Sequence, residues 1–309
     1  MLSQKGCIKM ANEIKVYRAD AGSCNGCDIE VLASLDPKYG IQDLNVKVVE
    51  HPEEANVLLI TGLVTKKTES AIKEIYEKIQ PPKLVIAYGQ CAVSMDVFYD
   101  SYNAAGAVDQ VLPVNLYIPG CPPSPRATMY GITKALGVEG FKAGDAIWNV
   151  PKAFRGKLAV DEEKCIGCGA CAEICPSKAI DIEQAQDKTT LKFWYSKCIG
   201  CGSCRDVCPP EAITMTEEFR LATNDRQTLH LTFTKGLQKC ASCGKEFAPT
   251  QVSSFGLEQA LAKITKYEQY KERLVKAASY CPECRKTLDR AKESKKLLLE
   301  LNQSSLSKP

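Results

Sequence analysis

Residues 164–180 of this chain, KCIGCGACAEICPSKAI, recur almost unchanged as KCIGCGSCRDVCPPEAI at residues 197–213. Each copy holds three cysteines with two residues between neighbours, then a fourth cysteine after three intervening residues, with a proline directly after it. An internal repeat of about 33 residues indicates repeated structural units. The sequence therefore predicts a small domain over residues 161–218, in which two similar halves pack as a pseudo-twofold pair.

The spacing of these eight cysteines is the pattern of two-cluster ferredoxins, in which the fourth cysteine of each run ligates the cluster of the other run. A [4Fe–4S] cubane needs four thiolates from several directions, and one tight loop supplies three of them. We therefore expect one cluster on Cys165, Cys168, Cys171 and Cys208, and another on Cys175, Cys198, Cys201 and Cys204. Zinc is the alternative, which the interleaved spacing disfavours.

Cysteine also sets the whole chain apart, with 17 cysteines against two histidines in 309 residues. Apolar residues make up 45% and charged residues 25%, and the net charge is +3, as in ordinary soluble proteins. The basic residues are spread out, which predicts no nucleic-acid partner. Because no apolar run reaches about 18 residues and the first residues lack an apolar signal core, we expect a cytoplasmic chain. Its thiolates then bind metal rather than form disulfides.

The N-terminal half alternates strand-like and helix-like segments. Strands are predicted at residues 13–17, 44–50, 56–60 and 83–89, and helices at residues 27–35, 67–80 and 124–136. This order predicts an α/β domain over residues 13–140, with a mostly parallel sheet and helices on both faces. In such sheets, ligands bind beyond the carboxyl ends of the strands.

Four cysteines lie in loops that follow these predicted strands. Cys24 and Cys27 belong to GSCNGCDIE, Cys91 to YGQCAVS and Cys121 to IPGCPPSP. If all three loops open at the same sheet edge, four thiolates meet at one point, which suits a single cubane. The residues alone leave a zinc site or unbonded buried cysteines as alternatives.

The stretches GSCNGCDIE, VLLITGLVT, LVIAYGQCA and VLPVNLYIPGCPPSP resemble the small subunit of [NiFe] hydrogenases and its homologue in respiratory complex I. This resemblance implies a flavodoxin-like domain and places on Cys24, Cys27, Cys91 and Cys121 the [4Fe–4S] cluster nearest the catalytic subunit. Complex I subunits have two adjacent cysteines in the first loop. The Cys24-x-x-Cys27 spacing instead resembles the hydrogenase branch, especially the membrane-bound, energy-converting type, although some sulfur-reducing relatives share it.

A third section, residues 219–309, contains two further cysteine pairs, Cys240-x-x-Cys243 and Cys281-Pro-x-Cys284. Four thiolates in two such knuckles favour tetrahedral zinc, with a rubredoxin-like single iron or an empty site as alternatives. A long helix-like stretch at residues 254–279 separates the two pairs, and a charged helical tail follows at residues 285–302. The stretch KCASCGKEFAPTQ resembles the C-terminal extension of the ferredoxin subunit in formate hydrogenlyase complexes, which implies a structural or docking role.

The predicted organisation is therefore a flavodoxin-like domain, an α+β two-cluster ferredoxin domain and a small helical, zinc-ribbon-like region. The boundaries are an extension at residues 1–12, the first domain at 13–140, a linker at 141–160, the ferredoxin domain at 161–218 and the four-cysteine metal-binding region at 219–309. Cys7 has no expected partner, and Met10 is an alternative start of the chain.

Three charged residues near the first cysteine loops are weaker candidates. Glu30 follows Cys27 by three residues, where a carboxylate can carry protons beside a hydrogenase site. The alternative is a residue in the first turn of a helix, which the helix dipole favours. Asp28 and Arg126 are expected to contact a partner subunit.

The sequence contains no nucleotide-binding glycine fingerprint and no nucleophile–base pair, so we expect no catalytic centre of its own. The resemblance implies an electron-transfer subunit of an energy-converting [NiFe] hydrogenase. Electrons from ferredoxin or a formate dehydrogenase subunit would pass through three [4Fe–4S] clusters to the [NiFe] large subunit. The complex would include membrane-embedded ion-translocating subunits, with this chain on the cytoplasmic face. A complex I-like quinone- or sulfur-reducing oxidoreductase is the main alternative, and a free-standing electron carrier is a third.

Overall fold

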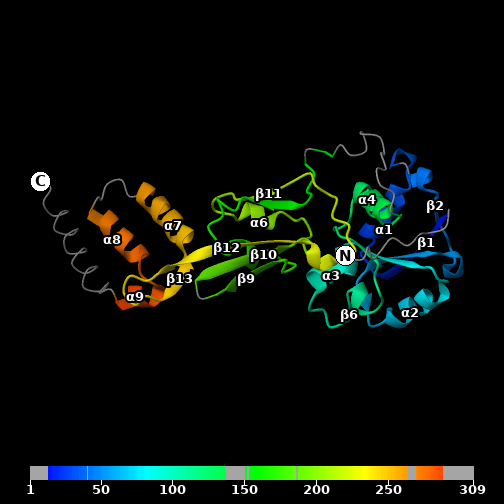
Figure 1. The fold of residues 1–309 in the computed structure, drawn as a ribbon, viewed down its shortest axis with the longest axis horizontal. Coiled ribbons are helices and arrows are strands. Elements are labelled where there is room, and N and C mark those ends of the chain that lie inside the picture. Colours follow the sequence, from blue (N-terminus) through cyan, green and yellow to red (C-terminus); the bar gives the residue numbers. More distant parts are fainter. Residues whose placement is uncertain are drawn as a thin grey trace, which may run out of the picture. The chain divides into compact units, whose positions relative to one another are not determined.

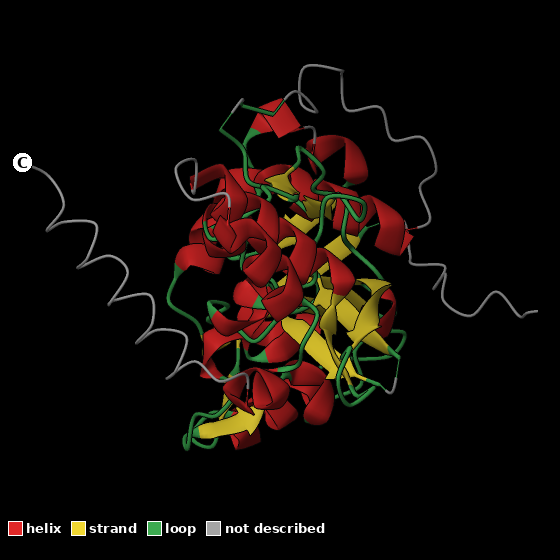
Figure 2. Ribbon diagram, turned by 90° about the vertical axis from the view of Figure 1, so that its left-hand side faces the viewer, coloured by secondary structure: helices red, strands yellow, loops and turns green. Residues whose placement is uncertain are grey.

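The computed structural model describes residues 13–39, 41–136, 150–151, 153–185, 187–263 and 269–287. Both helices and strands contribute to this part of the chain (Figure 2). The chain forms two compact units, which are described separately: residues 1–162, 170–181 and 192–232 in the first, and residues 163–169, 182–191 and 233–309 in the second. The predicted N-terminal extension with Cys7, residues 141–149 of the predicted linker and the tail beyond residue 287 lie outside the described residues.

A five-stranded parallel sheet forms the centre of the N-terminal part of the first unit (Figure 1). Its strands are β1 (Ile14–Gly22), β2 (Val46–Val48), β3 (Val57–Gly62), β5 (Leu84–Tyr88) and β7 (Leu116–Ile118), in the order β2-β1-β3-β5-β7. All four neighbouring pairs are parallel. Counted within the sheet, this is the order 2-1-3-4-5 of flavodoxin-like folds, so the predicted fold class is confirmed.

Helices cover both faces of the sheet. They are α1 (Gly26–Ser34), α2 (Glu69–Lys78), α3 (Gln90–Ser94) and α4 (Pro125–Leu136). α1 and α4 pack on each other, and α2 lies on the opposite side of the sheet (Figure 1). The three longer helices agree with the prediction, whereas α3 is too short to show a helical period in the sequence.

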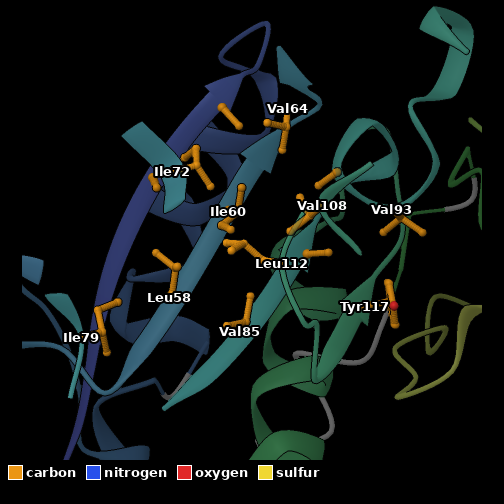
Figure 3. Close-up of a cluster of buried hydrophobic side chains, with 14 of the residues drawn as sticks. Leu58, Ile60, Val64, Ile72, Ile79, Val85, Val93, Val108, Leu112 and Tyr117 are labelled. Atoms are coloured by element: carbon orange, nitrogen blue, oxygen red, sulfur yellow. The ribbon is translucent and has the colours of Figure 1, made fainter. Parts of the chain in front are cut away.

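Alternate residues of β3 enter two different cores, because successive side chains of a strand point to opposite faces. Leu58 and Ile60 pack in one core with Ile72 of α2 (Figure 3). Leu59 packs in the other core with Val31 of α1. All six residues of β3 are buried, so this strand lies at the centre of the domain and fixes both helical layers.

Short elements connect the strands. A two-stranded antiparallel sheet pairs β4 (Val64–Thr65) with β6 (Ala104–Gly106). Single 3-10 turns occur at Pro37–Tyr39, Ile41–Leu44, Pro52–Glu54, Asp96–Phe98, Val108–Gln110 and Arg226–Thr228.

The cysteine repeat folds as two similar halves. Its elements are β8 (Leu158–Val160), α5 (Ala170–Glu173), β9 (Ile180–Gln184), β10 (Lys188–Trp194), α6 (Ser203–Asp206) and β11 (Ile213–Met215). The Asp161 N–H donates to the Ala212 carbonyl at 2.8 Å, and the Trp194 N–H donates to the Ala179 carbonyl at 2.8 Å. The segment entering each cysteine run therefore bonds to the segment leaving the other run, as expected of a pseudo-twofold pair.

The C-terminal part contains β12 (His230–Lys239), β13 (Glu246–Pro249), α7 (Thr250–Lys263), α8 (Gln269–Ala278) and α9 (Pro282–Thr287). β12 and β13 are antiparallel, and the sheet that contains them has the order β13-β12-β10-β9. Within the predicted helix-like stretch at residues 254–279, the structure describes two helices, α7 and α8, which pack against each other (Figure 1). Among the described helices, none has the length and apolar character that a bilayer crossing requires.

Candidate metal centres

The first four candidate ligands lie at one edge of the parallel sheet, as predicted. β1 ends at Gly22, shortly before Cys24 and Cys27, while Cys91 lies in α3 directly after β5, and Cys121 follows β7. Because these strands are parallel, their carboxyl ends point to the same edge. This edge is where flavodoxin-like sheets bind their ligands.

Close glycine contacts show that the three loops meet. A Cβ atom placed on Gly89 would lie 2.4 Å from Cys27 Sγ and 3.8 Å from the Gly120 carbonyl oxygen. One placed on Gly26 would lie 3.6 Å from Cys24 Sγ and 4.0 Å from Pro122 Cγ. The loop after β5 therefore contacts the first loop, and the first loop contacts the residue that follows Cys121.

The pKa values of these thiols indicate that they share one environment. Burial raises the pKa of Cys27, and the thiols of Cys91, Cys121 and Cys24 add to the effect. Burial also raises the pKa of Cys91 to about 12 and that of Cys121 to about 11, with the Asp96 carboxylate as the next cause in both. Such thiols ionise only beside a cationic centre, and an iron–sulfur cluster held by four cysteines fits this donor set.

Asp96 is a neighbour of this site that the sequence did not indicate. It is 4% exposed, and the Cys91 thiol lies 3.9 Å from its Oδ2 atom. Its Oδ1 atom is buried with no hydrogen-bond partner among the described residues. Burial raises the pKa of Asp96. The one signal in the sequence is its position five residues after Cys91, which is too weak to identify a buried carboxylate.

Asp28 lies inside the protein rather than on a partner-facing surface, so its expected contact with a partner subunit is wrong. It is 7% exposed and accepts hydrogen bonds from Arg18, from Ser23 Oγ at 2.7 Å and from Thr61 Oγ1 at 3.1 Å. Burial opposes ionisation of Asp28, but the hydrogen bonds from Ser23 and Arg18 outweigh it and lower the pKa. The carboxylate therefore fixes α1 to the end of β1 and to β3.

Glu30 is the fifth residue of α1, and Asp28 is the acidic residue of that helix's first turn. The helix-dipole explanation therefore applies to Asp28 and not to Glu30. Glu30 is partly buried, and this burial raises its pKa. The Glu30 carboxyl therefore holds a proton more readily than an exposed glutamate does, as a proton-carrying role requires.

In the repeat, Cys175, Cys198, Cys201 and Cys204 line one cavity together with apolar side chains that include Leu158, Ile180 and Met215. The Ala179 N–H lies 3.3 Å from Cys175 Sγ. Burial raises the pKa of Cys198 to about 12, the Gly200 N–H opposes this rise, and the neighbouring thiols add to it. Four thiols around a mostly apolar cavity fit a cubane whose sulfurs accept backbone N–H groups.

Of the other four repeat cysteines, Cys171 lies in α5 and Cys208 follows α6, both in the first unit. The Ala212 N–H lies 3.3 Å from Cys208 Sγ, which repeats the contact made at Cys175. Cys165 and Cys168 lie in the segment 163–169 of the second unit. The grouping of these four cysteines into one cluster stays a prediction.

The C-terminal candidates are the most compact set. The ligand atoms of Cys240, Cys243, Cys281 and Cys284 all lie within 4.8 Å of one another, and within the described chain they are the one such group of three or more metal-type ligands. The Sγ atoms of Cys243 and Cys281 are 3.8 Å apart. A tetrahedral zinc with Zn–S bonds of about 2.3 Å places its sulfurs about 3.8 Å apart, so this set fits one tetrahedral ion.

Backbone groups and charge favour a cation at this set. Burial opposes ionisation of Cys240, but the N–H groups of Cys243 and Cys281 outweigh it and lower the pKa to about 6. The pKa of Cys284 is raised to about 12 by hydrogen bonds with Cys243 and Cys281. The Cys240 thiolate therefore forms more easily than the Cys284 thiolate, and a bound cation would stabilise four close thiolates together.

A cavity of about 240 Å³ separates two of the cysteine loops within the first unit. On one side it is lined by the loop of Cys121, and on the other by the loop of Cys198. Phe154, Lys157 and Phe219 are among the other lining residues. The sequence did not predict this juxtaposition, because the lining segments are far apart along the chain.

Three family models match the chain. Residues 24–135 match the NADH ubiquinone oxidoreductase 20 kDa subunit, and residues 158–215 and 197–245 match two 4Fe-4S dicluster domain models. The first match contains all four cysteines of the sheet-edge site. The second contains all eight cysteines of the repeat.

Curated relatives carry names from hydrogenase and respiratory complexes. Formate hydrogenlyase subunit 7 of Escherichia coli is 43% identical over 42% of this chain and 51% of its own length. The probable membrane-bound hydrogenase subunit mbhJ of Pyrococcus furiosus is 43% identical over 39% of this chain and 72% of its own length. An NADH-quinone oxidoreductase subunit of Geotalea daltonii is 38% identical over 47% of this chain and 86% of its own length.

The chain thus spans about half the length of the Escherichia coli relative, but most of the length of the other two. The matches to these relatives cover less than half of this chain, while the dicluster models match residues beyond the first family region. The chain belongs to the family of the NADH ubiquinone oxidoreductase 20 kDa subunit, with 4Fe-4S dicluster domains in the same polypeptide.

Proposed function

We propose that this chain is the electron-transfer subunit of a multi-subunit, energy-converting [NiFe] hydrogenase. It would relay electrons through three [4Fe–4S] clusters to a [NiFe] large subunit, for H2 production or oxidation. The observation that carries the proposal is the cavity shared by the loops of Cys121 and Cys198. In this arrangement one polypeptide brings a site of the 20 kDa family next to a ferredoxin-type site.

The proposed ligand sets are those expected from the sequence. The cluster nearest the large subunit would bind Cys24, Cys27, Cys91 and Cys121; the others would bind Cys175, Cys198, Cys201 and Cys204, and Cys165, Cys168, Cys171 and Cys208. Mutual pKa effects of the thiols support the first set, and a common cavity supports the second. The repeat of the Ala179 contact at Ala212 supports the interleaved pairing.

Each cluster, when bound, accepts and donates one electron at a potential that depends on hydrogen bonds to its sulfurs and on burial. The chain's own residues supply both controls. The N–H groups of Ala179 and Ala212 donate toward Cys175 and Cys208, which stabilises the thiolate form. The sheet and α1 bury Cys27 to 8% exposure, which keeps water away from this ligand. Glu30 would hold a proton beside this site.

The C-terminal cysteines Cys240, Cys243, Cys281 and Cys284 would bind one zinc ion in a structural role. The 3.8 Å separation of the Cys243 and Cys281 sulfurs supports a single ion. Zinc has no redox chemistry, so this region would stabilise or dock the chain rather than conduct electrons. The proposed regions keep the boundaries 13–140, 161–218 and 219–309.

The large subunit would bind at the sheet edge that carries the first cluster. Ile29 and Leu32 of α1 are each 64% exposed although both are large and apolar, and they lie on one helix face because they are three residues apart. They lie two and five residues after Cys27 in the same helix, so we propose that a partner at the first site also covers them. Ferredoxin or a formate dehydrogenase subunit would deliver electrons to the ferredoxin domain. Membrane-embedded ion-translocating subunits would hold the complex on the cytoplasmic face of the membrane.

A complex I-like quinone- or sulfur-reducing oxidoreductase is the second candidate. The observation that favours it is the identity of 38% to the NADH-quinone oxidoreductase subunit of Geotalea daltonii over 86% of that protein's length. Both candidates use the chain in the same way, as a relay of electrons. They differ in the partner that receives the electrons, and therefore in nickel content.

Anaerobic purification of the complex through a tag on this chain, with nickel, iron and zinc counted, separates the two. We expect about one nickel per chain, and about twelve iron atoms from three cubanes in addition to the iron of any partner. About one zinc per chain is expected from the C-terminal set. Iron without nickel in an intact complex would reject the hydrogenase and favour the second candidate.

A further inference from the structure

The chain returns to the N-terminal sheet after the second cysteine run. Thr223 pairs with Tyr117 of β7: the Tyr117 N–H donates to the Thr223 carbonyl at 2.8 Å, and the Thr223 N–H donates to the Tyr117 carbonyl at 3.0 Å. β7 is the last strand of the five-stranded sheet. The returning segment therefore pairs with an edge strand, whose backbone groups are otherwise open to pairing.

The residue before this pair is fixed from a second direction. Ala222 is 5% exposed and packs in a core with Leu116 and Ile118 of β7. The Lys134 ammonium of α4 donates to the Ala222 carbonyl at 2.8 Å. A Cβ atom placed on Gly131 of α4 would lie 3.6 Å from Ala222 Cβ, so the helix approaches the segment closely.

Arg226 fixes the segment from a third direction. Its Nε atom lies 2.8 Å from Asp109 Oδ2, and its guanidinium also donates to the carbonyl of Val93. Val93 belongs to α3, the helix that carries Cys91. The Tyr117 hydroxyl donates to the same Asp109 oxygen at 3.1 Å. The Arg226 and Asp109 side chains are only 22% and 18% exposed, which places their interaction largely out of water.

The other end of this segment reaches the cavity between two cysteine loops. Leu221 lines that cavity together with Cys121 and Cys198. We define residues 221–228 as the strap. The strap thus begins beside the two cysteine loops and ends on the helix that carries a third cysteine, Cys91.

We propose that the strap sets the distance between the cluster on Cys24, Cys27, Cys91 and Cys121 and the cluster on Cys175, Cys198, Cys201 and Cys204, with Arg226 as the positioning residue. This inference rests on the cluster assignments of the proposed function. One electron would pass between these two clusters, so that one is oxidised as the other is reduced, and no atom is transferred. A fixed distance matters because a tether raises the effective concentration of the two sites only when it holds them in a geometry that permits transfer.

The test compares Arg226→Gln with Arg220→Gln in the anaerobically purified complex. Arg220 lies just before the strap and pairs with Glu218 in an ion pair whose side chains are 58% and 37% exposed, so its replacement is a matched control. The readouts are iron and acid-labile sulfide per chain, and the magnetic interaction between the two reduced clusters in pulsed electron paramagnetic resonance. We expect Arg226→Gln to keep its iron and to lose the interaction, and Arg220→Gln to keep both.

Arg226→Lys is expected to recover part of the interaction, because it retains a cation for Asp109 but cannot also bond to Val93 with the same geometry. An unchanged interaction in Arg226→Gln would overturn the inference. Loss of iron from Arg226→Gln would also overturn it, since the residue would then act on cluster retention rather than on distance. A complex without nickel would overturn the proposed hydrogenase. The role of the strap would still be decided by the magnetic interaction between the two clusters.

Discussion

At Gly89 there is room for a hydrogen atom but not for a methyl group. The residue follows β5 with a φ of +88°, a conformation that L side chains rarely adopt, and it lies against the sulfur of Cys27. Its own N–H donates to the Ile118 carbonyl at 2.9 Å. Glycine is thus required here both by the backbone and by the close approach to a proposed ligand.

Gly89→Ala is expected to remove the first cluster and leave the other two. Its Cβ would lie 2.4 Å from Cys27 Sγ, which forces the sulfur out of position. Iron analysis of the purified variant would then fall by about four atoms per chain. Gly256→Ala is the control, because a Cβ there meets nothing within 4 Å. Full iron content in Gly89→Ala would contradict the proposed role of Cys27.

At this scale the sequence predicts cysteine ligands more readily than it predicts the environments of carboxylates. Cysteine spacing identifies ligands because a cubane accepts few ligand arrangements. The environments of Asp28 and Asp96, by contrast, depend on which residues of other segments surround them. The sequence predicts that Asp28 contacts a partner subunit, whereas its hydrogen bonds with Arg18 and Thr61 hold it inside the protein.

Among the elements, the cysteine repeat consists of two similar halves. The N–H groups of Ala179 and Ala212 take equivalent positions at Cys175 and Cys208. Cys175 nevertheless lines a cavity with Cys198, which belongs to the other run. The repeat therefore relates the two halves of the sequence, while the cavity brings together cysteines of both runs.

Pairs of alanine substitutions test this arrangement. If the ligands interleave, Cys175→Ala with Cys198→Ala removes one cluster, or about four iron atoms, because both belong to the same site. Cys175→Ala with Cys165→Ala removes two clusters, or about eight iron atoms. Iron and sulfide analysis distinguishes the two double variants. The opposite result, with the larger loss in the first pair, would show that each run binds its own cluster.

The C-terminal helices are the element that the sequence described least well. A helix-like pattern at residues 254–279 predicts helix, but not that α7 and α8 pack against each other. Packing of α7 against α8 gives each helix a partner for its apolar side chains, which a single long helix would leave in water. The four cysteines could be predicted as a set because their spacing is local within each knuckle.

Removal of the metal from this region is expected to loosen it without affecting the clusters. Cys243→Ser should lose about one zinc per chain and keep all cluster iron. Because binding of structural zinc contributes directly to folding, hydrogen exchange should accelerate at the Ala241 and Gly244 N–H groups, which now bond to Ser279 and Cys240 carbonyls at 2.9 Å. Ser254→Ala, at an exposed position of α7, is the control. Iron instead of zinc in the wild-type chain would reject the zinc assignment.

At the scale of the whole molecule, the parallel sheet, the repeat and the cysteine sets could be predicted from local patterns. The contact between the sheet-edge site and the repeat could not, because it depends on segments more than 70 residues apart, such as Tyr117 and Thr223. That contact brings the loop of Cys121 and the loop of Cys198 to one cavity within the first unit. Close along the chain to Cys27, Ile29 and Leu32 of α1 are large apolar side chains that stay exposed.

Leu32→Glu tests whether α1 is the docking face for the large subunit. Leu32 is 64% exposed in this chain, so a glutamate there costs little before assembly, whereas burial of an unpaired carboxylate under a partner is unfavourable. Even about 1.4 kcal/mol weakens binding roughly tenfold. Nickel that co-purifies with the tagged variant should fall accordingly, while its own iron content stays unchanged.

Val275→Glu is the control for this variant. Val275 lies in α8 and is 50% exposed. Its replacement by glutamate introduces the same charge at an exposed apolar position, far along the chain from the cysteines of the first site. It should retain nickel at the wild-type level. If Leu32→Glu also retained its nickel, the large subunit would have to bind elsewhere, and the exposed apolar pair on α1 would need a different occupant.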